Sequence, residues 1–196
     1  MPSRNALILD GSQSGDYAIE QARGITVHRL ADTGCETTVL TLRTMMFNGC
    51  AACPEGDCEE KDNCISHDDG SRIREVYIAS DLIVILTPLR TGVYSFSIKN
   101  AIDRLLPIYA STLQHKGTRY RLVKPDIASP SLFAVGVAEA DDEDCERLFR
   151  TVVERTARAL HAPHCNALTL KRGATQEIWD RFITDGINDV CSRLTG

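Results

Sequence analysis

Four cysteines lie within fifteen residues of one another, at Cys50, Cys53, Cys58 and Cys64. Thiolates this close on one segment can surround a single metal centre, and an all-thiolate set suits an iron–sulfur cluster or Zn²⁺. Their spacing differs from a zinc knuckle made of two Cys-x2-Cys pairs and is nearer to ferredoxin-type ligation. A chain of 196 residues buries a core without disulfides, so the four cysteines indicate a metal or redox site. Three alternatives remain: a [4Fe–4S] cluster, free or reversibly oxidised thiols, and zinc.

A turn rich in glycine and hydroxyl side chains follows the first apolar segment of the chain. It runs from Gly11 to Asp16 with the sequence Gly-Ser-Gln-Ser-Gly-Asp. Backbone N–H groups and hydroxyls at the start of a helix can bind a phosphate, because the helix dipole adds partial positive charge there. The turn has neither the third glycine of a dinucleotide fingerprint nor the lysine of a P-loop. The alternative is a tight turn in which Asp16 or Ser14 caps the helix, and the carboxylate of Asp16 would repel a phosphate.

A second loop suited to ligand binding follows the most apolar segment, residues 82–87. Its sequence at residues 87–95 is Thr-Pro-Leu-Arg-Thr-Gly-Val-Tyr-Ser. Open α/β sheets bind ligands beyond the carboxyl ends of their strands, where the strand order reverses. We therefore expect this loop and the turn at residues 11–16 to meet at one edge of the sheet. The alternative is an ordinary connection punctuated by Pro88 and Gly92.

Strand-like and helix-like segments alternate along the chain. Short apolar or β-branched runs predict five strands, at residues 5–10, 36–42, 82–87, 132–137 and 166–170. Helical spacing predicts a helix after each of them, at residues 16–30, 69–80, 95–109, 141–160 and 175–193. This alternation predicts a doubly wound α/β fold with a mostly parallel sheet covered on both faces.

The composition fits one folded domain spanning residues 1–196, with a cysteine-rich insertion at about 44–68 and a basic connection at about 111–130. Both stretches are too long for ordinary connections and are expected to carry function. A hydrophobic fraction of 43% excludes a disordered chain. No apolar run reaches the roughly 18–20 residues of a membrane span, and the N-terminus lacks a signal-peptide core, so we expect a cytoplasmic protein without a membrane partner. The net charge of −5 argues against nucleic-acid binding through a basic surface.

Three of these segments together resemble a known family. They are the turn at residues 11–16, the cysteine segment with its Cys-Ile-Ser-His-Asp-Asp-Gly end at residues 64–70, and the loop at 87–95 followed by Lys-Asn-Ala-Ile-Asp-Arg at 99–104. The chain resembles the flavodoxin-like NADPH-dependent FMN reductases over most of residues 5–170, and among these it is most similar to the iron–sulfur flavoproteins. The resemblance implies a three-layer α/β/α flavodoxin-like fold with a five-stranded parallel sheet, and FMN as cofactor.

The resemblance also implies which residues bind FMN. The phosphate is expected to contact Ser12, Ser14, Gly15, Asp16 and Tyr17. The flavin ring is expected to lie against the loop formed by Thr87, Pro88, Leu89, Arg90, Thr91, Gly92 and Val93, with backbone N–H groups from Pro88 onward at the ring edge. Val137 and Ala138, after the fourth strand, are expected to face the ring as well. Asp16 and Tyr17 stand where many relatives carry small hydroxyl residues, and Arg90 stands where an aromatic residue is common.

Several charged residues have structural or cofactor roles in this interpretation. Lys99, Asp103 and Arg104 are expected to fix their helix and an oligomer contact, since the resemblance implies a homodimer or homotetramer. The basic connection offers Lys116, Arg119 and Arg121 to the flavin phosphate or to NAD(P)H, or else forms a solvated or subunit-contacting loop. Arg90 would raise the flavin potential if it points at the ring; the alternative is a solvated charge of the loop.

The function expected from these features is that of an FMN-binding redox protein. Three of the four cysteines match family positions and Cys58 completes the set, so the leading expectation is an iron–sulfur flavoprotein that moves electrons between a [4Fe–4S] cluster, FMN and a small-molecule or protein partner. One alternative is an NAD(P)H-dependent FMN or quinone reductase without a cluster. The other is a zinc-stabilised binding module that is not an enzyme.

Overall fold

The computed structural model describes residues 4–50, 68–116, 119–122 and 128–193. Its centre is a parallel sheet of five strands in the order β2-β1-β3-β6-β7. The strands are β1 (Arg4–Asp10), β2 (Cys35–Thr41), β3 (Leu82–Leu89), β6 (Ser131–Ala138) and β7 (Cys165–Lys171). The predicted five-stranded parallel sheet is therefore confirmed.

Two of the inner strands, β3 and β6, are buried on both faces. Their sequences are nearly continuous apolar runs, which suit strands covered by helices on both sides. Their register pairs Leu82 with Ser131 and Leu89 with Ala138, so both strands end at the same edge of the sheet. β2 and β7 are the edge strands of the sheet, and they are less completely buried than the inner strands.

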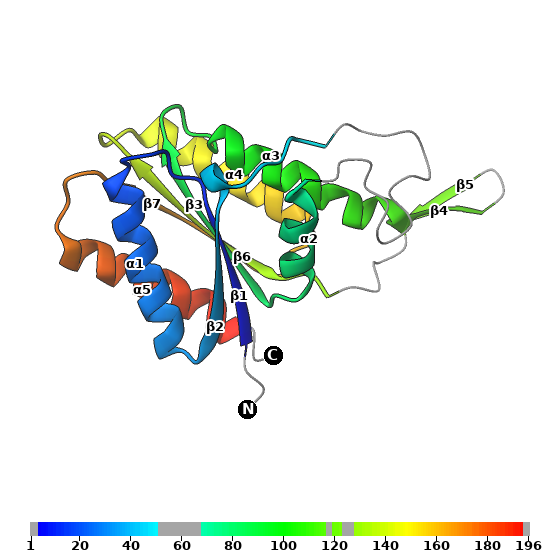
Figure 1. The fold of residues 1–196 in the computed structure, drawn as a ribbon, viewed down its shortest axis with the longest axis horizontal. Helices are drawn as coiled ribbons and strands as arrows, with labels where there is room; N and C mark the ends of the chain where they lie inside the picture. The colour runs from blue at the N-terminus through cyan, green and yellow to red at the C-terminus, as the bar shows by residue number, and fades with distance from the viewer. Residues whose placement is uncertain (1–3, 51–67, 117–118, 123–127, 194–196) are drawn as a thin grey trace.

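Helices cover both faces of the sheet (Figure 1). They are α1 (Tyr17–Asp32), α2 (Gly70–Ile78), α3 (Phe96–Leu105), α4 (Glu143–Ala159) and α5 (Gln176–Arg193). One apolar core joins the sheet to α1 and α5, with Ile19 and Trp179 among its buried side chains. The other joins the opposite face to α2, α3 and α4, with Tyr77, Ile98 and Phe149. This is the three-layer α/β/α arrangement expected from the sequence.

The strand order reverses beside β1. From β1 the chain crosses to β2 on one side, and from β2 it crosses back past β1 to β3 on the other side. The turns that leave the carboxyl ends of β1 and β3 therefore run to opposite faces of the sheet and leave a crevice between them, where ligands of this fold class bind. The first turn leads into α1 and the loop after β3 leads into α3.

The stretch at residues 111–130 is not simply an irregular connection. It contains a short antiparallel hairpin of β4 (Leu113–Lys116) and β5 (Arg119–Leu122), preceded by a 3-10 helix, η2 (Leu106–Thr112). Each strand has only four residues, too few for the alternating pattern that reveals longer strands. The hairpin projects from the body of the molecule, away from the start of α1 (Figure 1).

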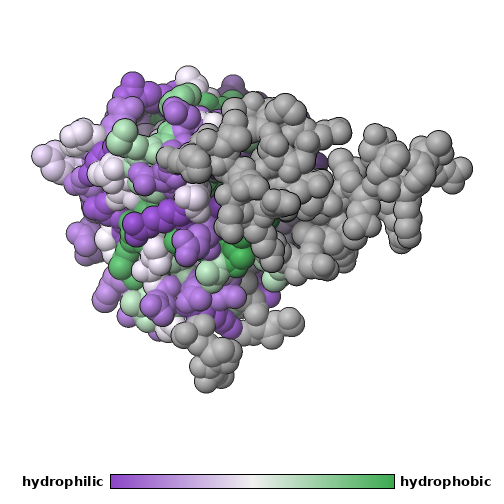
Figure 2. Space-filling view, turned by 45° about the vertical axis from the view of Figure 1, so that its right-hand side comes forward, coloured by the Kyte–Doolittle hydropathy of each residue, from purple (hydrophilic) through white to green (hydrophobic). Residues whose placement is uncertain are grey.

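On the face shown in Figure 2, the described residues are predominantly polar, with small scattered apolar patches. None of the described helices is long and apolar enough to cross a membrane.

Candidate functional site

A buried carboxylate lies at the start of the turn after β1. Asp10, the last residue of β1, is fully buried, and its Oδ1 accepts a hydrogen bond of 2.8 Å from the backbone N–H of Ser12. Its Oδ2 lies 2.7 Å from Nη1 of Arg23, a residue of α1. A buried carboxylate needs such partners, because desolvation without them costs several kcal/mol. The interactions of Asp10 therefore fix where the turn leaves the sheet.

The middle of this turn offers unpaired hydrogen-bond donors. The backbone N–H groups of Gln13, Ser14 and Gly15 make no hydrogen bond within the described residues. Gly15 has a φ of +77°, a left-handed conformation that favours glycine, and no atom lies within 4 Å of the place where a Cβ would stand. Successive free amides beside a helix N-terminus form an anion-binding concavity. The residues present therefore fit a phosphate group.

Asp16 caps the N-terminus of α1, as one of the sequence alternatives predicts. Its Oδ1 accepts from the backbone N–H of Ile19 at 3.5 Å and from Nη2 of Arg172 at 3.0 Å. The side chain of Asp16 is 10% exposed, whereas that of its neighbour Tyr17 projects into solvent. The carboxylate that would repel a phosphate is thus paired with a cation from the end of β7.

A second arginine reaches the turn from the end of β2. Arg43 lies in a short 3-10 helix, η1 (Leu42–Thr44), and its guanidinium group donates to the Oγ of buried Ser12. Another nitrogen of Arg43 lies 3.5 Å from a carboxylate oxygen of Glu20. Sequence reasoning missed Arg43. The available signal was its position two residues beyond the end of β2, because parallel strands end at the same edge of the sheet.

The loop after β3 contacts the turn after β1. A Cβ on Gly11 would lie only 2.6 Å from Oγ of Ser95, the residue that precedes α3. The backbone N–H of Ser95 donates to Oγ1 of Thr87 at 2.9 Å, which closes the loop. The structure therefore brings the two predicted segments together at one edge of the sheet, and glycine at position 11 permits this close approach.

Packing against α4 shapes the tip of the loop after β3. Gly92 has a φ of +74°, and a Cβ there would lie 2.8 Å from the carbonyl oxygen of Cys145. Tyr94 packs edge-to-face on Phe149, with ring centroids 6.0 Å apart. Burial raises the pKa of Tyr94 to about 12, so its hydroxyl stays protonated at neutral pH.

The predicted ring-contacting residues differ in their exposure to solvent. Thr87 and Leu89 are buried, so only their backbones could touch a ligand at the surface. The exposed positions are Arg90, Thr91 and Val93, while Pro88 is half-buried. The backbone N–H groups of Arg90 through Val93 make no hydrogen bond within the described residues.

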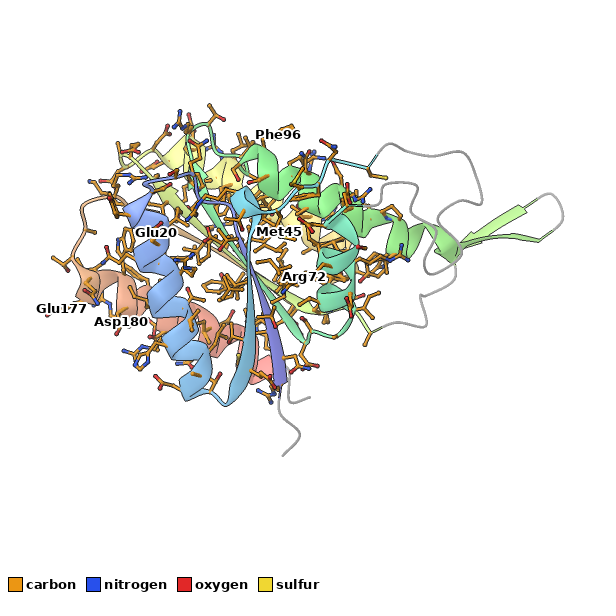
Figure 3. All side chains as sticks on the ribbon, in the orientation of Figure 1. Glu20, Met45, Arg72, Phe96, Glu177 and Asp180 are labelled. Carbon is orange, nitrogen blue, oxygen red and sulfur yellow. The ribbon has the colours of Figure 1, made fainter. Side chains whose placement is uncertain are left out.

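Residues after β3 and at the end of β6 also lie at this edge of the sheet. Phe96, the first residue of α3, is 81% exposed and marks the helix start in Figure 3. Val137 and Ala138 do not form a loop after the fourth predicted strand, because they are the last two residues of β6 and are buried. The carbonyl of Ala138 accepts from the backbone N–H of Arg172 at 2.8 Å.

The cysteine cluster falls mostly outside the described residues. Cys50 is half-buried, and Cys53, Cys58 and Cys64 lie in the segment that the structure does not describe. The described residues contain no group of three or more histidine, cysteine or acidic side chains that could hold a metal. The proposed metal site therefore remains a prediction.

The two ends of the cysteine-bearing segment are joined near α3. The carboxylate of Asp69 accepts from the backbone N–H of Met46 at 2.7 Å, and the backbone N–H of Asp69 donates to the carbonyl of Met46 at 3.0 Å. Asp68 forms an ion pair with Arg104, a buried residue of α3. These contacts place both ends of the segment against α3, the helix that begins at the candidate site.

The charged residues of α3 have the helix-fixing role expected of them. Lys99 and Asp103 form an ion pair one turn apart, and Arg104 pairs with Asp68. Arg104 is buried within the chain, so it does not offer an exposed oligomer contact. For Lys99 and Asp103 an oligomer contact stays a prediction.

A separate groove lies between α1 and the first turns of α5. It has a volume of about 600 Å³ and is lined by residues that include Ile25, Arg29 and Glu177. Arg29 pairs with Asp180 across it, and this hydrogen-bonded arginine lowers the pKa of the Asp180 carboxyl. The groove does not contain any predicted site residue.

A doubly wound parallel sheet with a turn of unpaired amides at the point of strand reversal defines a flavodoxin-like α/β protein. The family model for NADPH-dependent FMN reductase matches residues 5–124. The chain belongs to this family, whose members are FMN-dependent oxidoreductases. The resemblance seen in the sequence is thus confirmed at the level of the reductase family.

Solved structures share the fold at low sequence identity. The NAD(P)H:quinone oxidoreductase from Methanothermobacter marburgensis is 18% identical, with a TM-score of 0.70 over 95% of this chain and 96% of that one. The FMN-dependent NADH-azoreductase from Bacillus anthracis is 11% identical, with a TM-score of 0.62 over 98% of this chain and 100% of that one. None of the curated proteins matches the sequence.

Proposed function

We propose that this protein binds FMN at the edge formed by β1 and β3 and uses NAD(P)H to reduce a flavin or a quinone. The observation that carries the proposal is the row of unpaired amides at Gln13, Ser14 and Gly15, placed beside the N-terminus of α1 where the strand order reverses. Membership of the reductase family and the quinone-reductase name of one structural relative support it.

The turn at residues 12–17 is the proposed phosphate site. Free amides and the hydroxyl of Ser14 would donate to the phosphate oxygens. Ser12 is buried and accepts a hydrogen bond from Arg43, so it would hold that guanidinium group beside the phosphate. Arg43 also brings positive charge to a turn that has no lysine or arginine of its own.

The loop at residues 87–93 is the proposed ring site. Bound FMN supplies hydride and one-electron chemistry, and the chain supplies position and electrostatics. The unpaired amides of Arg90, Thr91 and Gly92 would donate to polar atoms at the ring edge and stabilise negative charge there. The exposed side chains of Val93 and Phe96 would shield an apolar ring from water.

This proposal does not need the iron–sulfur cluster. The family match and the quinone- and azoreductase names of the relatives favour the reductase without a cluster at least as well as the iron–sulfur flavoprotein. The cluster is tested by iron and sulfide analysis of protein purified under argon. Equal amounts of iron and sulfide that disappear in Cys58→Ser, with FMN retained, would support a cluster, whereas a yellow iron-free protein would refute it.

The decisive test of the proposed function uses FMN and NAD(P)H directly. Flavin-free protein is titrated with FMN while flavin fluorescence is followed, and NADPH or NADH oxidation is then measured with a quinone as acceptor. We expect micromolar or tighter FMN affinity and quinone-dependent oxidation of the nicotinamide. Gly15→Val, which places a β-branched side chain at a positive φ, should weaken FMN binding. Gly34→Val introduces the same strain at the far end of α1 and should leave FMN affinity unchanged.

We also infer a homodimer or homotetramer. The support is that exposed apolar side chains gather near the proposed ring site, at Val93 and Phe96, where burial against a second subunit would stabilise an oligomer. Light scattering coupled to size-exclusion chromatography tests the mass, and a strictly monomeric protein would refute this inference.

A further inference from the structure

Arg172 connects the end of β7 to the turn after β1. Its Nη2 lies 3.0 Å from Oδ1 of Asp16, and its Nε lies 2.9 Å from a carboxylate oxygen of Glu139. The Asp16 side chain is 10% exposed and that of Glu139 is 72% exposed. Because solvent screens the contact with Glu139, the ion pair with Asp16 is the stronger electrostatic interaction.

Asp16 stands at an unfavourable place for a protein that binds a phosphate. It directly follows the free amides of Ser14 and Gly15, at the N-terminus of α1. The helix dipole stabilises its carboxylate there, but the same carboxylate competes with a phosphate for this positive end and repels it. Among the described residues Arg172 is the one cation that pairs with it.

We propose that Arg172 is a positioning residue that neutralises Asp16 and turns its carboxylate away, so that the turn can accept the doubly charged phosphate monoester of a flavin. This inference rests on the proposed function. Arg172 acts through Asp16 and does not itself contact the ligand. FMN affinity therefore depends on Arg172 only while residue 16 carries a carboxylate. Riboflavin has no phosphate, so its affinity does not depend on the ion pair between Arg172 and Asp16.

A double-mutant cycle with two ligands tests this dependence. Flavin-free wild type, Arg172→Gln, Asp16→Asn and the double variant are titrated with FMN and with riboflavin. Arg172→Gln should weaken FMN binding roughly tenfold or more and change riboflavin binding by less than about twofold. In the double variant FMN affinity should return to the wild-type value or above it. Asparagine caps helices as well as aspartate does, so α1 remains folded in both Asp16 variants.

The control removes a positive charge from elsewhere on the chain. Arg193→Gln breaks the exposed pair with Asp189 at the end of α5 and should leave FMN affinity unchanged. Double-variant FMN binding as weak as that of Arg172→Gln, or a parallel loss of riboflavin binding, would overturn the proposal. If the wild type binds FMN tightly and Arg172→Gln binds it equally well, this proposal alone would be overturned. A wild-type protein that binds neither flavin would overturn the proposed function and this proposal with it.

Discussion

The turn after β1 and the loop after β3 lie against each other, but different forces hold them in place. Ion pairs fix the turn after β1, where Arg23 pairs with buried Asp10 and Arg172 pairs with Asp16. Packing fixes the second, because Gly92 lies against α4 and Tyr94 lies against Phe149.

This difference matches the two ends of the proposed ligand. A phosphate needs fixed donors and a balance of charge, whereas a planar ring needs a shaped and mostly neutral surface. Tyr94 adds to this contrast, since its buried hydroxyl is neutral and brings no charge to the second loop.

The largest effect on stability is expected in the packed loop. Gly92→Ala puts a Cβ at a positive φ and 2.8 Å from a backbone oxygen, so we expect the free energy of unfolding to fall by about 3 kcal/mol. Gly34→Ala is the matched control, with a φ of +76° and open space around the Cβ, and should cost about 1 kcal/mol. Urea denaturation measures both, and equal losses would show that packing on α4 does not shape the loop.

The next effect concerns the ionic turn. Arg23→Met leaves the fully buried Asp10 carboxylate without its cation and should lower the free energy of unfolding by about 2 kcal/mol, less than for a wholly buried pair because the Arg23 side chain is 29% exposed. Asp10→Asn in the same chain should recover part of this loss. If Arg23→Met is as stable as wild type, charge pairing does not hold the turn.

The same contrast shows what could be predicted from the sequence. Unbroken apolar runs such as residues 82–87 predicted the strands, and their alternation with helices predicted that they run parallel. The two loops could be assigned to one edge because all five strands run in one direction. The four-residue strands at Leu113–Lys116 and Arg119–Leu122 gave no comparable pattern.

The ion pairs of the site could not be predicted in this way. Arg172 and Asp16 are 156 positions apart in the sequence, and Arg43 and Ser12 are 31 positions apart. Hydrophobic periodicity places elements in layers but does not say which long polar side chain reaches across an edge. Asp16 caps α1, as one of the alternatives from the sequence predicts, but its ion pair with Arg172 has no signal in the sequence.

A smaller effect, visible only at high pH, is expected from Tyr94. Its pKa is about 12 in the folded protein and about 10 when unfolded, so between these values the folded state holds a proton that the unfolded state has lost. Stability should therefore fall as the pH rises from 10 to 12, by roughly 1 kcal/mol per pH unit from this group. Tyr94→Phe should flatten this part of a plot of unfolding free energy against pH. An unchanged slope would show that the hydroxyl is not shielded from water in the packed loop.

The smallest effect is expected from Arg90, the exposed charge at the tip of the otherwise neutral loop. If its guanidinium group lies near bound FMN, Arg90→Ala removes stabilisation of negative charge on the ring and should lower the two-electron potential by roughly 10–20 mV, since an exposed pair contributes below about 1 kcal/mol. Arg193→Ala, at the end of α5, serves as the control and should leave the potential unchanged. Potentiometric titration of the flavin absorbance measures both variants. A potential that does not move in Arg90→Ala would mean that the second loop acts on the ring through its amides and its shape alone.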